Sequence, residues 1–159
     1  MGKRSLILVV ALGAVLAFWL YRKYRVAPDL AVEHLNLKNP DGSTFNTNDL
    51  RGKTLFVNYW ATWCGDCLQE MPSIESAYNS TDREKVVFLM VTDDTPDRMN
   101  AFLAKHNYPM QFVYIDQRLQ EIGINTLPTT YIFDEEGNEL FTHVGGLDWS
   151  DPGIVQLLK

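Results

Sequence analysis

The stretch WATWCGDC, residues 60–67, places two cysteines three positions apart, directly after the almost continuously apolar run TLFVNYW at residues 54–60. Such a run is typical of a central strand covered on both faces, and residues 65–79 have the pattern of a following helix. Cys64 then lies at a helix N-terminus, where free backbone N–H groups favour a thiolate, with Cys67 one turn further on. We predict a redox-active pair in which Cys64 attacks and Cys67 resolves.

Two other interpretations of the cysteine pair remain open at this point. The pair is a static disulfide, or it is half of a metal site shared with another chain. The helix dipole contributes only about 0.3–1 kcal/mol, less than the roughly 1.4 kcal/mol of one pKa unit, so N–H to sulfur hydrogen bonds must supply the rest of any activation. No histidine or third cysteine follows at ligand spacing, so we expect neither a metal nor a cofactor.

Strands and helices alternate around this junction. Apolar or alternating runs predict strands at residues 32–37, 54–60, 85–92, 111–115, 129–133 and 139–144. Capping and turn signals predict helices at residues 65–79, 95–107, 116–123 and 151–158, with Thr95 and Asp116 as N-caps. This order, closed by a hairpin, predicts one α/β domain over residues 26–159, a three-layer sandwich with a mixed central sheet.

The N-terminal 25 residues have a different composition. They carry five basic residues and no acid, and the apolar run at residues 5–21 would span roughly 25 Å as a helix, enough to reach across a bilayer core. Aromatic residues at 18–21 beside Arg22 and Lys23 favour an uncleaved transmembrane anchor in the lipid bilayer. A cleaved signal peptide ending near residues 15–17 and a buried soluble helix are the alternatives.

The net charge of −6 divides into +5 for residues 1–25 and −11 for residues 26–159, which hold nine basic and 20 acidic residues. An acidic domain argues against a general nucleic-acid binder, because phosphate neutralisation needs a basic surface. We expect the acidic runs at residues 93–94 and 134–136 to be solvated loops. The three scattered histidines have the positions of surface or edge residues.

Three segments resemble a known family. WATWCGDC, the helix beginning within it, and TLPTT at residues 126–130 before a strand and hairpin resemble the thioredoxin fold. CLQEMP at residues 67–72 further resembles the membrane-anchored TlpA/ResA-type thiol-disulfide oxidoreductases, which include the cytochrome c maturation reductases. The resemblance covers about residues 28–158, and it implies a strand-helix insertion between the cysteines and the TLPTT segment.

Several site residues follow from this resemblance. It implies that Pro128 is a cis-proline facing the dithiol and that Leu127 presents its backbone to an extended substrate strand. It also implies that Glu70 is a buried acid relaying protons to and from the cysteines, while Trp63 and residues 144–146 form the rim of the groove. The alternatives are a proline that merely opens a strand and an exposed helix glutamate.

The sequence departs from the family pattern at two positions. Asn58 stands where plain thioredoxins have a buried aspartate, which leaves Glu70 as the only candidate for that acid's task. Gly65 and Asp66 lie between the cysteines, and Asp66 replaces the proline that commonly precedes the second one. A carboxylate there opposes a thiolate at Cys64, so we predict a more reducing couple than with proline.

The resemblance implies an enzyme tethered to the bacterial inner membrane, with its domain facing the periplasm or cell exterior. It implies protein disulfides as substrates, apocytochrome c among them, and a membrane electron donor that recharges the thiols. We expect reduction, although the same cysteines oxidise substrates if the disulfide form is the less stable. A dithiol copper(I) carrier and a non-catalytic thioredoxin-like interaction module are the competing hypotheses.

Overall fold

The computed structural model describes residue 7, residues 10–17 and residues 35–159. Residues 7 and 10–17 are helical, and their larger apolar side chains are exposed. Among the described residues, no helix combines the length and the apolar character that crossing a bilayer requires. The predicted span at residues 5–21 is described only in part, and the predicted domain boundary after residue 25 lies outside the described residues.

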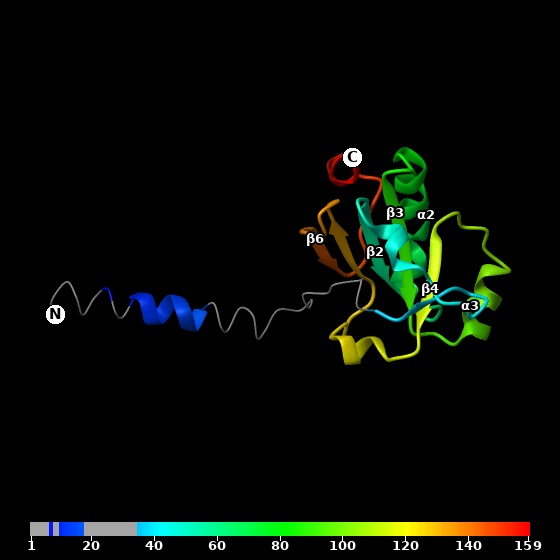
Figure 1. Ribbon diagram of the computed structural model, residues 1–159, viewed down its shortest axis with the longest axis horizontal. Helices are drawn as coiled ribbons and strands as arrows, with labels where there is room; N and C mark the ends of the chain where they lie inside the picture. The colour runs from blue at the N-terminus through cyan, green and yellow to red at the C-terminus, as the bar shows by residue number, and fades with distance from the viewer. Residues whose placement is uncertain (1–6, 8–9, 18–34) are drawn as a thin grey trace.

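The domain is built on one six-stranded sheet (Figure 1). The strands are β1 (Leu37–Lys38), β2 (Thr54–Tyr59), β3 (Val86–Thr92), β4 (Gln111–Ile115), β5 (Thr129–Phe133) and β6 (Glu139–Val144), in the order β1-β4-β3-β2-β5-β6. Strand β3 pairs parallel with β2 and with β4. The other pairs, β1 with β4, β2 with β5 and β5 with β6, are antiparallel. The predicted mixed sheet is therefore confirmed.

Within residues 35–159, the helices are short except for the one that begins at the cysteines. They are α2 (Gly65–Ser80), α3 (Pro96–Leu103) and α4 (Pro152–Val155), with 3₁₀ helices η2 (Thr47–Leu50), η3 (Leu119–Ile122) and η4 (Gln156–Leu158). The segment between α2 and β5 thus contains β3, α3, β4 and η3. Figure 1 shows α2 alongside β3, with α3 beside β4.

The sheet has a hydrophobic core on each face, because side chains along a strand point alternately to the two sides. Phe56 of β2 belongs to the core that includes residues of α2 and α3, and partly buried residues of α4 pack against it. Leu55 and Val57 belong to the other core, which is completed by Leu50 of η2 and Leu119 of η3. Within the described residues the α-helices therefore cover one face, and the third layer consists of 3₁₀ helices and loops.

The predicted helix at residues 95–107 ends early. Thr95 caps α3 as predicted, but the helix stops at Leu103. His106 and Tyr108 leave the helix to stack on Phe102, at ring-centroid distances of 4.5 and 6.3 Å. Pro109 follows, and the residue before a proline avoids the helical conformation. The chain therefore enters β4 after an extended connection.

Two other boundary predictions were wrong. Asp116 does not cap a helix: it forms an ion pair with Lys38, and the first N–H of η3, from Leu119, is instead bonded by the Asp93 carboxylate at 3.0 Å. The strand expected at residues 32–37 is only β1, Leu37–Lys38, in the part of the chain that the structure describes. Its neighbour Leu35 is buried but not paired in a strand.

Candidate active site

The two cysteines form a disulfide at the start of α2. Their Cα atoms lie 5.3 Å apart, within the range for this bond. Cys64 is the N-cap of α2, and its sulfur accepts a hydrogen bond from the Cys67 N–H at 3.2 Å. Cys64 is 7% exposed and Cys67 is fully buried. Cys64 is therefore the cysteine that another molecule can approach, as its assignment as the attacking thiol requires.

A buried carboxylate binds the backbone of the loop that precedes the disulfide. Asp94, which follows β3, is 5% exposed and accepts a hydrogen bond from the Thr62 N–H at 2.6 Å. It also lies 4.0 Å from the guanidinium of Arg98. The expectation of a solvated loop at residues 93–94 was thus wrong, because Asp93 and Asp94 each satisfy a backbone N–H of a neighbouring segment. Asp94 fixes the position of the chain just before Cys64.

Glu70 lies one helical turn after Cys67 and is 4% exposed, so the interpretation as an exposed helix glutamate does not hold. One carboxylate oxygen, Oε1, accepts from the Asn58 side-chain amide at 2.7 Å. The other, Oε2, accepts from the Trp149 indole N–H at 2.9 Å and from the Leu147 N–H at 3.2 Å. Three donors, one from β2 and two from the segment after β6, therefore meet one buried carboxylate.

The environment of Glu70 sets its proton affinity. Burial raises the pKa of Glu70 above its ordinary value of 4.5, and the charge of Asp66 acts in the same direction. The hydrogen bonds from Trp149, Asn58 and Leu147 act against this rise, because they stabilise the charged form. Burial prevails. A carboxyl with a raised pKa is better matched to a thiol for exchanging a proton than an exposed glutamate is.

Asn58 connects Glu70 to the sheet. It is fully buried in β2, and its amide nitrogen donates to Glu70 and also to the Thr130 hydroxyl of β5 at 2.8 Å. Its amide oxygen has no hydrogen-bond partner among the described residues. Asn58, which stands where plain thioredoxins have an aspartate, thus donates a hydrogen bond directly to Glu70, the candidate acid.

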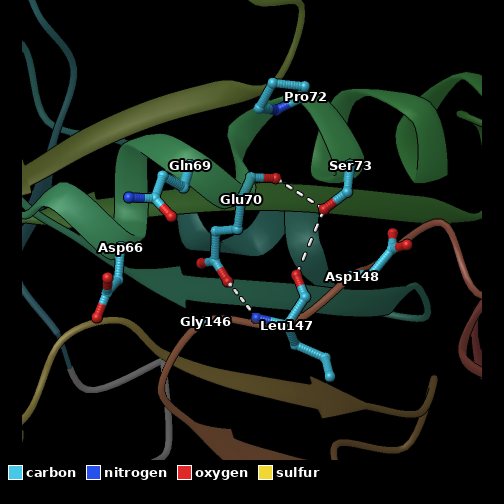
Figure 2. Close-up of a pocket in the computed structure, with 8 residues that line it drawn as sticks. All are labelled: Asp66, Gln69, Glu70, Pro72, Ser73, Gly146, Leu147 and Asp148. Atoms are coloured by element: carbon cyan, nitrogen blue, oxygen red, sulfur yellow. Dashed lines mark hydrogen bonds between the residues drawn. The ribbon is translucent and has the colours of Figure 1, made fainter.

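An open cavity of about 690 Å³ lies on the Glu70 side of α2 (Figure 2). Figure 2 shows Glu70 pointing from α2 toward Leu147, with Asp66 on the preceding turn and Asp148 across the opening. Ser73 joins the two walls, since its hydroxyl lies 2.8 Å from the Glu70 carbonyl and 3.4 Å from the Leu147 carbonyl. Gly146, part of the predicted rim loop, also lines the cavity.

The peptide bond between Leu127 and Pro128 is cis, the geometry that the resemblance implies. Pro128 directly precedes β5, whose first residue, Thr129, pairs with Tyr59 at the end of β2. Pro128 therefore lies at the same edge of the sheet as the loop to Cys64. Its carbonyl accepts from the Gly145 N–H at 2.8 Å, and Gly145 has a φ of 101°, a conformation that favours glycine.

Of the remaining predicted residues, Trp63, Gly65 and Asp66 are neighbours of the cysteines in the chain, whereas Leu127 precedes the cis-proline. Trp63 is 67% exposed, and Leu127 is partly buried and packs against both cores. Gly65 and Asp66 form the first turn of α2. Among the described residues, no group of three or more histidine, cysteine, aspartate or glutamate side chains is placed to hold a metal ion.

Sequence reasoning missed Trp149 and Asp94. Trp149 is fully buried and 79 positions from Glu70, so only the packed fold brings them together. Asp94 lay within an acidic pair, which is a common feature of solvated loops. Its position directly after a parallel strand, at the edge of the sheet where the β2 loop also lies, was the one signal that could have found it.

Comparisons with known proteins agree with this geometry. The model of the AhpC/TSA family matches residues 25–138. The thiol-disulfide oxidoreductase ResA of Geobacillus thermodenitrificans is 31% identical over 137 residues, 83% of this chain and 78% of the relative. The thioredoxin-like protein YneN of Bacillus subtilis is 33% identical over 123 residues, 75% of this chain and 69% of the relative. The structure of StoA from Bacillus subtilis aligns with a TM-score of 0.62 at 19% identity, covering 79% of this chain and 96% of that one.

A thioredoxin-like fold with a Cys-x-x-Cys disulfide at the start of a helix, together with these matches, places the chain in the AhpC/TSA family. It is an enzyme of the thiol-disulfide oxidoreductase class. Within that class several relatives, the Geobacillus protein among them, carry the name ResA, so the resemblance drawn from the sequence is confirmed.

Proposed function

We propose that this protein is a membrane-tethered reductase of protein disulfides that acts outside the cytoplasm through Cys64 and Cys67. The observation that carries the proposal is the combination of a slightly exposed Cys64 with a buried carboxyl, Glu70, one turn beyond the fully buried Cys67. One cysteine is accessible to a partner, and an acid lies close in sequence to the cysteine that must lose a proton. This division of roles suits an exchange enzyme better than a static crosslink.

The reaction begins with both cysteines reduced. The Cys64 thiolate attacks one sulfur of the substrate disulfide, which forms a mixed disulfide and releases one substrate thiolate. Cys67 then gives its proton to the Glu70 carboxylate and attacks the Cys64 sulfur, which releases the second substrate thiolate. The enzyme disulfide that results has given two electrons to the substrate. Glu70 returns its proton to Cys67 when a thiol donor reduces the enzyme again.

Transfer of protons is assigned to Glu70 because its carboxyl has two stable states in this site. Ionised, it accepts three hydrogen bonds, and protonated, it avoids the cost of a buried charge. The groove for the substrate strand is assigned to Leu127, Pro128 and the rim residue Trp63. These residues follow the family resemblance, and their positions at the edge of the sheet that carries Cys64 support the assignment.

Tethering to the bacterial inner membrane is proposed from the sequence of residues 5–21. Helical backbone at residues 10–17 with exposed apolar side chains supports it. The proposed donor is a membrane thiol protein, and apocytochrome c is the proposed substrate that the family resemblance implies. After an alkaline wash the chain should remain with the membranes, and protease added to spheroplasts should digest the domain. Release by the wash, or full protection from protease, would contradict the proposed location.

The reductase activity is tested by comparing the number of enzyme disulfides formed with the number of peptide disulfides reduced. The reduced full-length protein in detergent is mixed with a peptide that contains one disulfide, and all free thiols are alkylated at timed intervals. Mass spectrometry should show one Cys64–Cys67 disulfide formed for each peptide disulfide reduced, and Cys64→Ser should abolish the exchange. A dithiol that stays reduced beside an excess of peptide disulfide would contradict the proposal. Tight copper(I) binding that protects both thiols from a limiting amount of dithiothreitol would favour the carrier hypothesis instead.

A further inference from the structure

A second groove lies next to the disulfide, beside α3. It has a volume of about 520 Å³, and its lining includes Trp63, Leu68, Arg98, Phe102, Lys105 and His106. None of these residues belongs to the Glu70 cavity. We call this site the Trp63 groove.

The lining of the Trp63 groove includes apolar residues that are neighbours of Cys64 in the chain or in hydrogen bonding. Within residues 35–159, the large hydrophobic side chains that are exposed are Trp63, Leu68 and Leu140, and two of these three line the groove. Trp63 directly precedes Cys64, and the Leu68 N–H donates to the Cys64 carbonyl at 3.1 Å. Exposed apolar side chains so close to a reactive atom indicate a surface that contacts a partner.

The charged and titratable residues of the groove are all basic, although the domain as a whole is acidic. Arg98 lies on α3, and Lys105 and His106 follow the end of that helix. The charge of Arg98 is partly compensated by Asp94, whose carboxylate lies 4.0 Å from the guanidinium. The same carboxylate also accepts a hydrogen bond from the Thr62 N–H. Lys105 is exposed. The groove therefore offers positive charge beside its apolar residues.

The charge has the opposite sign on the other side of α2. Asp66, Glu70 and Asp148 line the cavity of Figure 2. At about 100° per residue, Leu68 lies about 200° around the helix from Asp66, so the two openings lie on opposite sides of α2. A polypeptide that crosses the disulfide thus meets a basic apolar groove on one side and an acidic opening on the other.

We propose that the Trp63 groove binds the segment of a partner protein beside its reactive cysteine, and that this segment contains apolar and acidic residues. Apolar side chains of the segment contact Trp63 and Leu68, and its carboxylates lie near Lys105 and Arg98. The inference rests on the proposed function, since it assumes that the partner's cysteine reacts at Cys64. Beyond the proposed function, it states the chemical class of the partner's segment and the side of α2 on which that segment binds.

The test uses two peptides of identical composition and charge. Each contains one cysteine, present as its disulfide with 2-mercaptoethanol, with a leucine and two glutamates on one side and serines on the other. The two peptides differ only in whether the acidic side precedes or follows the cysteine. Because their net charges are equal, the general repulsion by the acidic domain is the same for both. Release of the peptide thiol by the reduced full-length protein is followed at low salt.

One order should be reduced about fivefold faster than the other, which corresponds to about 1 kcal/mol. The ratio should fall to about one in Lys105→Glu and decrease as salt is added, whereas Lys85→Glu should retain it. Lys85 precedes β3 at the end of the sheet away from the disulfide loop, so it makes the same change of charge at a distant place. Equal rates for the two peptides, or a ratio that Lys105→Glu does not change, would overturn the inference. Failure of the protein to reduce either peptide would instead refute the proposed function.

Discussion

Replacement of Trp149 by phenylalanine removes one hydrogen bond to Glu70 while it retains a buried aromatic ring. The indole N–H lies 2.9 Å from Glu70 Oε2, and the ring packs edge to face on Phe56 at a centroid distance of 4.9 Å. A hydrogen bond to a charged group contributes about 1.5–3 kcal/mol, and one to a neutral group about 0.5–1.5 kcal/mol. The loss should therefore be larger when Glu70 is ionised.

Trp60→Phe is the matched control for this change. Trp60 is also fully buried in the same hydrophobic core, but its indole N–H has no hydrogen-bond partner among the described residues. Both variants lose similar apolar contact. Trp60→Phe also removes a buried N–H that has no partner, so the part of the difference that changes with pH isolates the hydrogen bond to ionised Glu70.

Urea unfolding of the oxidised protein, followed by circular dichroism, measures both variants across the pH range. At pH values where Glu70 is ionised, the free energy of unfolding should fall by about 1.5–3 kcal/mol more in Trp149→Phe than in Trp60→Phe. The difference should shrink at acid pH, where Glu70 is protonated. Equal losses at every pH would refute the argument that Trp149 stabilises the Glu70 carboxylate.

Three further changes test other parts of the site. Because burial raises the pKa of folded Glu70 above 4.5, the free energy of unfolding should decrease as pH rises from that value through the folded pKa, and Glu70→Gln should abolish this slope in urea titrations; an unchanged slope would contradict it. Asp66→Pro should make the couple less reducing in a redox titration, by about 30 mV for each tenfold change in equilibrium, and a fall in potential would sink that reasoning. Asp94→Ala leaves the Thr62 N–H without its acceptor and should cost about 1–3 kcal/mol of unfolding free energy, whereas no loss would show that Asp94 does not hold the loop.

The sequence predicted the sheet well because its strands have strong local signals. Strands β4, β5 and β6 have the predicted bounds, and α2 begins at Gly65 as predicted. These elements are short apolar or alternating runs between clear turns, so local pattern decides them. The α3 boundary failed because Phe102 stacks with aromatic residues that follow it, a tertiary contact that the helical pattern does not contain.

The cysteines of the candidate site could be predicted and their surroundings could not. Spacing and a strand-helix junction were sufficient for Cys64 and Cys67. Burial of Glu70 depends on Trp149 and Leu147, which reach it from the far end of the chain. The offset of three residues from Cys67 placed Glu70 near the disulfide, but two of the three donors to its carboxylate come from the packed C-terminal segment.

Trapping of a mixed disulfide tests the central claim most directly, namely that Cys64 attacks a partner and Cys67 resolves it. The Cys67→Ser and Cys64→Ser variants of the full chain are each produced in the native membrane, and adducts are analysed by mass spectrometry under non-reducing conditions. Cys67→Ser should accumulate a partner protein joined through Cys64, and Cys64→Ser should accumulate far less. Adducts that form equally in both variants, or in neither, would contradict the assigned roles of the two cysteines.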